Sequence, residues 1–398
     1  MTEDAALDMA TEKVVPPSLA RLFVSFLRLG LTAFGGPAMI AYIKQMAVKH
    51  NRWLDEEAFK DGIVLCQSLP GATAMQAAAY VGLKVKGVGG ALASYLGFGL
   101  PAFVLMLFLS VAYAASHGLN HVAALMSGLQ VIVVAIIAHA TVTFGLEVRR
   151  SYKSLLVAAL SAVLLLRGIN PFAVIAGAAI LGAVLFKDAN TTPSSVLPLG
   201  RKPIRGALKE VALLILLVIA GLGALYFLDA KLFALAAVML KVNLLFGGGF
   251  SSIPLLFHEI VSVKGWMDSK TLMDGMALGQ ITPGPILITA TFIGYLLFGF
   301  TGAIVATITM FAPSFLVLLL AAPYFDRLKS SALFSGASKM IVASFVGLLL
   351  FVTLRFATDV PWDPKRTVLA LAALIALFRK VDILYIVLVG AVISMVIF

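Results

Sequence analysis

The sequence predicts an all-α polytopic membrane protein made of two inverted-topology repeats. Three observations lead to this fold class: the composition, a repeat of the chain at an offset of about 212 residues, and one apolar segment without a counterpart. Of the 398 residues, 61% are hydrophobic and only 12% are charged, whereas soluble domains are about 25% charged. Apolar runs of about twenty residues, long enough to cross a bilayer, recur along the chain. The short alternating segments of a transmembrane β-barrel are not found.

The repeat is visible as aligned Gly, Pro, Trp and Asp residues. At an offset of 212 the matches include Phe34/Phe246, Gly35/Gly247, Gly36/Gly248, Gly82/Gly294, Gly90/Gly302 and Pro101/Pro313. At an offset of 213 they include Trp53/Trp266, Asp55/Asp268, Asp61/Asp274, Gln67/Gln280, Pro70/Pro283 and Gly71/Gly284. The predicted division is a cytoplasmic tail at 1–18, a first repeat at 19–186, a basic linker plus connecting helix at 187–232, and an inverted second repeat at 233–398.

The unmatched apolar run at 208–228 determines the relative orientation of the repeats. If each repeat crosses the membrane an even number of times, one added crossing turns the second repeat upside down. Loop charges agree, because the Lys and Arg counts on the two faces are five and one in the first repeat and two and four in the second. By the positive-inside rule, the linker and the N-terminus are then cytoplasmic. Such inverted repeats are typical of secondary transporters.

We expect six helical segments in each repeat, of which two are interrupted by Gly and Pro. The interrupted segments are 20–48 and 57–83 in the first repeat and 232–262 and 268–298 in the second. Alternatively, these segments are re-entrant hairpins. Each repeat then still crosses the membrane an even number of times, but it crosses fewer times. The polar N-terminus has no apolar signal-peptide core, and the single cysteine, Cys66, excludes an intrachain disulfide.

The interruptions predict an anion site in the membrane. A helix that begins at mid-membrane presents free N–H groups and about half a positive elementary charge, and such an end binds anions. Freed backbone groups must face protein, water or ligand, because lipid cannot bind them. The alternative is that the breaks are hinges that help the helices to pack. The candidate substrate-binding residues at the breaks are Gly35, Gly36, Pro37, Gln67, Pro70, Gly71, Thr73, Gly247, Gly248, Gln280, Thr282, Pro283, Gly284 and Pro285.

Two cations are added to the candidate site. Arg28 and Lys241 each stand seven residues before a glycine break, about two helical turns away and on nearly the same face. Lys44, Lys339 and the pair His258-Glu259 are expected at the interfaces, and His139 is expected to pack in an apolar helix. Glu259 is the one carboxylate expected near the pathway. No cofactor, metal site or catalytic residue is predicted, since no enzyme or metal-binding motif is found.

The paired motifs FGGP, W53LDEEAF and Q67SLPG, with FGGG, W266MDSKTL and Q280ITPGP in the second half, resemble the chromate ion transporter family in its long two-domain form. The resemblance covers nearly the whole chain outside the tail and linker. It implies a bacterial-type inner-membrane protein that exports chromate and confers chromate resistance. The chain departs from its own pairing at Gly249, where the first half has Pro37.

The sequence also leaves alternatives to chromate export. The net charge of +11 is mostly explained by the positive-inside rule, and an electropositive anion route is a second explanation. Sulfate has the charge and shape of chromate, so a transporter of another oxyanion is the main alternative. An intramembrane enzyme or a cation carrier would need nucleophiles, metal ligands or carboxylates that the sequence does not show. Expected partners are the oxyanion and the lipid bilayer, with no nucleic acid; the oligomeric state is open, with a homodimer as one candidate.

Overall fold

The computed structural model describes residues 17–34, 36–116, 119–149, 151–185, 204–244, 249–324 and 331–398. The first repeat contains α2 (Leu19–Thr32), α3 (Gly36–Lys44), the π-helical η1 (Gln45–His50), α4 (Glu56–Ser68), α5 (Thr73–Ala115), α6 (Asn120–Val148), α7 (Tyr152–Leu166) and α8 (Pro171–Leu185). The connecting helix is α9 (Ile204–Leu228). Most of the tail and the linker as far as 203 lie outside the described residues.

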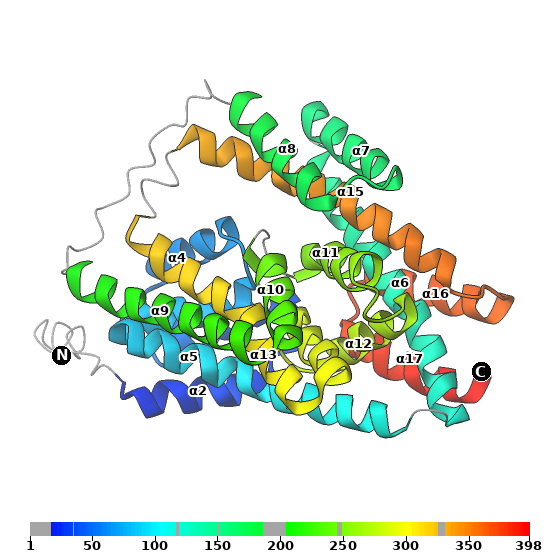
Figure 1. Cartoon of the computed structure of the whole chain (residues 1–398), viewed down its shortest axis with the longest axis horizontal. Helices are drawn as coiled ribbons and strands as arrows, with labels where there is room; N and C mark the ends of the chain where they lie inside the picture. Colours follow the sequence, from blue (N-terminus) through cyan, green and yellow to red (C-terminus); the bar gives the residue numbers. More distant parts are fainter. Residues whose placement is uncertain are drawn as a thin grey trace, which may run out of the picture.

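The second repeat has the same order of elements. It contains α10 (Ala230–Leu244), η2 (Gly249–Ser252), α11 (Ile253–Leu256), η3 (Phe257–Val263), α12 (Ser269–Ile281), η4 (Ile286–Ile288), α13 (Thr289–Ala321), η5 (Ala322–Tyr324), α15 (Ala332–Asp359), α16 (Pro364–Phe378) and α17 (Ile383–Ile397). The described part of the chain consists of helices joined by short turns and loops, as Figure 1 shows. This confirms the predicted all-α fold class.

The matched aspartates of the two repeats begin corresponding helices. Asp55 caps α4 by accepting from the N–H of Ala58 at 2.6 Å, and Asp268 caps α12 by accepting from Thr271 at 2.7 Å. A side-chain oxygen at this position satisfies one of the N–H groups that the first turn leaves free. The sequence identity at these positions therefore has a local structural cause.

Helices α5 and α13 each reverse direction at a glycine. Gly87 (φ +68°) and Gly299 (φ +63°) adopt left-handed backbone conformations inside α5 and α13. A Cβ added at Gly82 would lie 2.1 Å from the carbonyl oxygen of Gly90, although residues eight apart in a straight helix are about 12 Å apart. Each labelled helix is therefore a short arm followed by a long helix that runs back along it.

The short arms pair with α4 and α12 to form two antiparallel hairpins. In the first, Tyr80 donates from its hydroxyl to the carbonyl of Ala58 at 3.2 Å, and its ring packs on Gly62. In the second, Phe292 packs on Gly275 in the same way. The chain turns at Pro70-Gly71 and at Pro283-Gly284-Pro285, so each Pro-Gly break is the tip of a hairpin.

The tips lie beside the middle of the long helices of the opposite repeat. A Cβ at Gly71 would lie 2.0 Å from Ser314 Oγ, and a Cβ at Gly284 would lie 2.8 Å from the Cβ of Ala102. Ser314 and Ala102 are matched at the repeat offset and stand near the midpoints of residues 300–321 and 88–115. Each hairpin therefore reaches only half the length of a crossing helix, and its two arms return to the same face.

The two repeats run in opposite directions. Matched residues Thr141 of α6 and Thr353 of α15 hydrogen-bond through their hydroxyl oxygens at 3.1 Å. Gly145 lies one turn after Thr141 in α6, and it faces Val346, which lies two turns before Thr353 in α15. The equivalent helices are therefore antiparallel where they touch, as an axis in the membrane plane requires.

We name the two ends of the molecule by residues that lie there. The Gly87 face carries the starts of α2 and α4 and the reversal at Gly87. The Pro361 face carries the end of α5, the starts of α6 and α12, and Pro361. The hairpin α4–α5 enters from the Gly87 face, and the hairpin α12–α13 enters from the Pro361 face.

Each repeat gives its last two helices to the other. Helices α7 and α8 pack on α15, whereas α16 and α17 pack on α6. The contacts are close: a Cβ at Gly347 would lie 2.3 Å from the carbonyl oxygen of Ala158, and one at Gly390 would lie 2.0 Å from Ile132. Neither repeat therefore completes its core alone.

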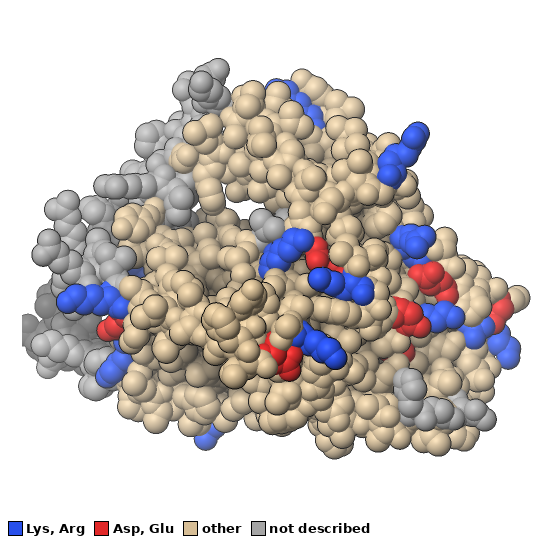
Figure 2. All heavy atoms as spheres, in the orientation of Figure 1, with Lys and Arg blue, Asp and Glu red and all other residues tan. Residues whose placement is uncertain are grey.

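Five helices among the described residues are long and apolar enough to cross a membrane: Thr73–Ala115, His121–Val148, Lys209–Leu228, Ile286–Tyr324 and Leu333–Asp359. Helix α9 lies at the periphery, because only 6% of its apolar stretch is buried inside the protein. The view in Figure 2 shows a surface made mostly of uncharged side chains, as contact with lipid requires. The chain is a multi-pass membrane protein.

The expected number of membrane crossings, six in each repeat and one in the connecting helix, needs correction. Segments 57–83 and 268–298 do not cross, because each folds back at its Pro-Gly tip, which is the alternative that the sequence left open. The physical reason is the run of tight contacts between the arms, such as Phe292 against Gly275. Both interrupted segments of each repeat can thus return to their own face without changing the parity.

We predict that Gly82→Val and Gly294→Val destabilise the protein because a side chain there strikes the backbone of Gly90 or Gly302. Overpacking of this kind costs about 1–3 kcal/mol, and thermal denaturation in detergent measures it. Gly177→Val in α8 is the matched control, since a Cβ there meets nothing within 4 Å. Equal melting temperatures for Gly82→Val and Gly177→Val would contradict the fold-back of α5.

Candidate functional site

Hairpin tips from both repeats meet at the centre of the molecule. The N–H of Gly284 donates to the carbonyl of Ala33 at the end of α2, at 3.1 Å. The N–H of Ala72 donates to Ser314 Oγ at 3.0 Å. Since Gly284 and Ser314 belong to the second repeat and Ala33 and Ala72 to the first, the tips bind across the repeat boundary rather than within one repeat.

Asn243, near the end of α10, joins the same centre. Ser314 Oγ donates to Asn243 Oδ1 at 3.1 Å while it accepts from Ala72. Ser314 is fully buried and Asn243 is 2% exposed. One serine therefore connects the Pro70-Gly71 tip to the residues that lead into the 245–248 break, which itself lies outside the described residues.

Two amide groups at this centre keep an atom without a hydrogen-bond partner among the described residues. Gln76 uses its Nε2 to donate to the carbonyls of Pro70 at 2.8 Å and Ser314 at 3.2 Å, which leaves Oε1 unpaired. Asn243 uses its Oδ1 to accept from Ser314, which leaves the Nδ2 donor unpaired. A buried polar atom without a partner costs about 1–3 kcal/mol. Asn243 Nδ2 is therefore a donor available to an anion, whereas Gln76 fixes the tip.

A helix N-terminus adds further donors at the same place. Helix α5 begins at Thr73, and its N-cap Ala72 provides no side-chain cap. The first N–H groups of a helix have no partner within that helix. The start of α5, with Asn243 beside it, is thus a concentration of donors and partial positive charge.

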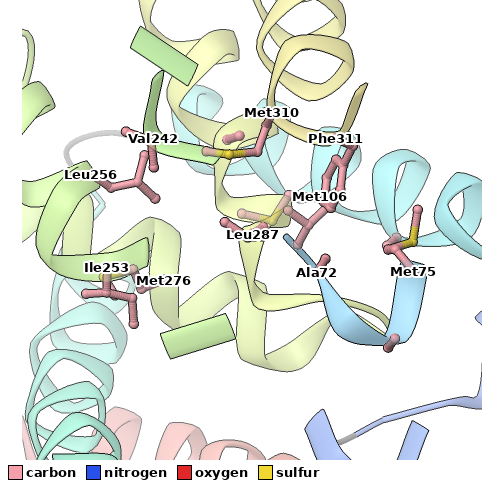
Figure 3. Packing of buried hydrophobic residues seen from close by; sticks show 14 of the residues in the cluster. Ala72, Met75, Met106, Val242, Ile253, Leu256, Met276, Leu287, Met310 and Phe311 are labelled. Carbon is pink, nitrogen blue, oxygen red and sulfur yellow. The ribbon is translucent and has the colours of Figure 1, made fainter. Parts of the chain in front are cut away.

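The surroundings of this centre are apolar. Figure 3 shows Ala72, Met75, Met106, Leu287 and Phe311 around the first tip, all of them buried. Hydrogen bonds and charges act more strongly in such surroundings than in water. The arrangement is suited to holding a desolvated anion through a few well-placed donors.

The structure brings together most of the predicted break residues that it describes. Gly71, Thr282, Pro283, Gly284 and Pro285 are buried, and Pro70, Thr73 and Gln280 are half-buried. Gly71 (φ +123°) and Gly284 (φ +113°) hold conformations that favour glycine. Gly36 and Pro37 begin α3, although their side chains are outside the described part, as are Gly35, Gly247 and Gly248 altogether.

Arg28 and Gln67 are not part of the buried contacts. Both side chains are exposed, and neither has a hydrogen-bond or ion-pair partner among the described residues. The buried face of α2 is formed instead by Leu22, Phe26 and Gly30. Arg28 nevertheless lies only five residues, about 7 Å along the axis, before Ala33.

Lys241, added to the candidate site from the sequence, is paired with a buried carboxylate. Its Nζ lies 2.6 Å from Glu259 Oε1, where the glutamate side chain is 5% exposed, and 4.0 Å from the centroid of the Phe172 ring. The two residues bridge α10 and η3, the two arms of a hairpin, because a buried carboxylate needs a cation. Glu259, expected at an interface, is therefore buried in an ion pair.

Asp274 is a buried carboxylate that the sequence analysis missed, and the expectation that Glu259 was the one such group is wrong. Asp274 accepts from the hydroxyl of Tyr113 at 2.8 Å and from Gln130 Nε2 at 2.7 Å, both in the first repeat. The match of Asp61 with Asp274 was visible in the repeat. Its partners were not, because their contact depends on how α12 packs against α5 and α6.

Gln76, Asn243 and Ser314 were missed for a related reason. Each is a single polar residue in an apolar helix, without a motif around it. His139, expected to pack, does so against the ring of Phe378 with centroids 4.9 Å apart.

Comparison with known proteins supports the transporter architecture. The family model described as "Chromate transporter" matches the chain twice, at residues 20–183 and 233–395. No solved structure matches the chain significantly.

Relatives with curated names extend over nearly the same length. An uncharacterized transporter of Methanocaldococcus jannaschii is 41% identical over 384 residues, which cover 96% of this chain and 95% of that protein. The chromate transport protein of Pseudomonas aeruginosa is 31% identical, over 82% of this chain and 77% of its own. That of Cupriavidus metallidurans is 28% identical, over 92% and 90%. With its two matched halves and their interlocked hairpins, the chain belongs to the chromate transporter family.

Proposed function

We propose that this protein exports chromate from the cytoplasm across the inner membrane, with its N-terminus on the cytoplasmic side, and so gives chromate resistance. The observation that supports this most is the meeting of hairpin tips from opposite faces beside the midpoints of the crossing helices. Relatives named chromate transport proteins identify chromate as the first substrate to test.

The substrate site that we propose is the space beside the tip centre. The start of α5 and Asn243 Nδ2 supply donors, and Gly35, Gly247 and Gly248, also predicted to bind the substrate, lie outside the described residues. A tetrahedral dianion has four acceptor oxygens and no proton to donate. A set of donors without a nearby free carboxylate therefore suits it.

Arg28 has a separate role in this proposal. Its guanidinium is exposed and has no carboxylate partner among the described residues, so it is available to an anion that approaches the tips along α2. A cation that lines an approach route raises the local anion concentration without being buried.

Alternating access follows from the pairing of hairpins. One hairpin enters from the Gly87 face and its counterpart enters from the Pro361 face, so an exchange of conformations between the repeats would expose the same centre to either side. The central site stays in place while the repeats move against each other.

The membrane potential is sufficient to drive export. A dianion that leaves an inside-negative cell gains roughly 4.6 kcal/mol at about 100 mV, at ~2.3 kcal/mol per charge. A tenfold concentration ratio corresponds to ~1.4 kcal/mol, so this free energy supports a chromate concentration gradient near a thousandfold without a coupling ion.

The main alternative is transport of another oxyanion such as sulfate. Both anions would use the same donors, so discrimination depends on ion size and on the energy of removing water. Competition by sulfate in the chromate assay distinguishes the two substrates.

We predict that Asn243→Asp lowers chromate efflux at least tenfold. The new oxygen still accepts from Ser314, whereas the free Nδ2 donor becomes an oxygen that repels the substrate. The effect is measured as chromate accumulation in cells that express the wild type or the variant, with and without sulfate as a competitor. Asn170→Asp is the matched control because Asn170 caps α8 through its Oδ1, at 2.9 Å from the N–H of Phe172, which an aspartate also does. Normal efflux by folded Asn243→Asp protein would exclude Asn243 from the site.

A second prediction separates two roles of Lys241. If Lys241 only neutralises Glu259, Lys241→Met fails to fold or transport, and Lys241→Met/Glu259→Met recovers both, because no charge is left unpaired. If Lys241 contacts the substrate, the double variant folds but does not transport. We expect recovery of folding and of more than half the efflux, measured by size-exclusion profile and chromate accumulation.

The third prediction concerns the driving force. Collapsing the potential at a constant pH gradient in chromate-loaded vesicles abolishes concentrative transport, since two charges move with each ion. Collapsing the pH gradient at constant potential has a smaller effect. Unchanged transport without a potential would refute potential-driven export.

A further inference from the structure

A carboxylate outside the tip centre links the two repeats at one face. Asp274 lies on α12, the outer arm of the hairpin that ends at Pro283-Gly284-Pro285. Its two carboxylate oxygens are held by Tyr113 near the end of α5 and by Gln130 of α6. All three side chains are less than 10% exposed. The link therefore holds a tip-bearing hairpin of one repeat against two long helices of the other.

A pocket of about 340 Å³ lies outside this link, at the Pro361 face. Its lining includes Tyr113, Ser127, Gln130, Lys270, Asp274 and Pro361. Asp274 and its partners thus form the inner end of a hollow that opens towards the surface. Further inward along α5, Met106 lies seven residues before Tyr113, about 10 Å along the axis, and is fully buried beside the tip centre.

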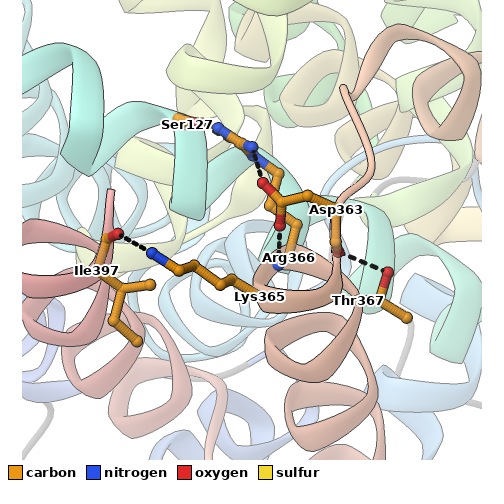
Figure 4. Close-up of polar contacts among 6 residues, drawn as sticks. All are labelled: Ser127, Asp363, Lys365, Arg366, Thr367 and Ile397. Carbon is orange, nitrogen blue, oxygen red and sulfur yellow. Dashed lines mark hydrogen bonds and ion pairs between the residues drawn. The ribbon is translucent and has the colours of Figure 1, made fainter.

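Polar contacts beside the pocket hold Ser127, one of its lining residues. Asp363 caps α16 by accepting from the N–H of Arg366 at 2.7 Å, and it also pairs with the Arg366 guanidinium. These contacts hold the pKa of Asp363 below its usual range. Arg366 Nη2 donates to Ser127 Oγ of α6 at 2.9 Å; Figure 4 shows the ion pair of Arg366 with Asp363 beside Ser127. The start of α6 is therefore anchored to α16, whereas the hairpin arm α12 is attached across the pocket through Asp274.

Among the described residues, the link has no equivalent at the Gly87 face. The residue matched to Asp274 is Asp61, which is half-buried. The residues matched to Tyr113 and Gln130 are Phe325 and Val342. A phenylalanine and a valine cannot donate a hydrogen bond, so this asymmetry follows from the side-chain chemistry alone. Two related repeats would otherwise favour the two access states about equally, and the link favours one of them.

We propose that Asp274, with Tyr113 and Gln130, is the gate of the Pro361 face: it holds the α12–α13 hairpin against α5 and α6 and closes the pocket from the central site. Asp274 is a positioning residue, since it acts on the hairpin and does not touch the substrate. Opening towards the Pro361 face then requires both hydrogen bonds to break. The inference rests on the proposed alternating access.

Accessibility of Met106 tests the gate without any substrate. The reporter is Met106→Cys in a chain that also carries Cys66→Ala, labelled with a membrane-impermeant thiol reagent. Spheroplasts and inverted vesicles expose the two faces separately. We expect Asp274→Ala to raise the labelling rate from the Pro361 face at least tenfold and not from the Gly87 face. Asp61→Ala, the matched control, leaves both rates unchanged.

Tyr113→Phe covers the case in which Asp274→Ala does not fold. It removes one donor and keeps the ring, whose centroid lies 5.1 Å from that of Phe292. We expect a smaller increase at the same face. An unchanged rate in a folded variant, or an increase at the Gly87 face, overturns the gate. Since no chromate is involved, this outcome is distinguishable from a failure of the proposed transport, which would leave the labelling pattern intact.

Discussion

The need to satisfy backbone polar groups away from water is the constraint on which this architecture depends. Each Pro-Gly interruption frees N–H and C=O groups in a region where lipid offers no partner. The chain meets this by folding back, so that the tips lie against protein. Ala72 and Gly284 donate their N–H groups to the opposite repeat, and Gly71 and Gly284 allow the close approach that those bonds need. The hairpins therefore depend on the partner repeat for their stability.

Mutual dependence also explains the exchange of helices. The pair α7–α8 completes the surface of α15, and α16–α17 completes that of α6. Small residues such as Gly347 and Gly390 allow these helices to approach closely, which is how membrane helices associate without a hydrophobic driving force. The repeats are therefore joined by close apolar packing at the exchanged helices and by polar contacts at the hairpins.

Symmetry of the backbone is combined with asymmetry of the polar side chains. Ser314 binds the first tip, whereas its matched residue Ala102 has no hydroxyl to bind the second tip. Asp274 has two donors at the Pro361 face, whereas Asp61 faces no matched donors. These substitutions make the polar contacts of the two halves unequal without changing the helices.

The sequence by itself determined the all-α fold class, the two matched halves, the extra helix between them and the positions of the breaks. These follow from composition, hydrophobic length and the distribution of Gly and Pro, which are local properties of the chain. Whether the broken segments cross or return was decided by tertiary packing, since Gly62 against Tyr80 and Gly275 against Phe292 are contacts between segments. The pairing of Lys241 with Glu259 and the partners of Asp274 were decided in the same way. An isolated polar residue in an apolar helix shows what it binds only when the neighbouring helices are in place.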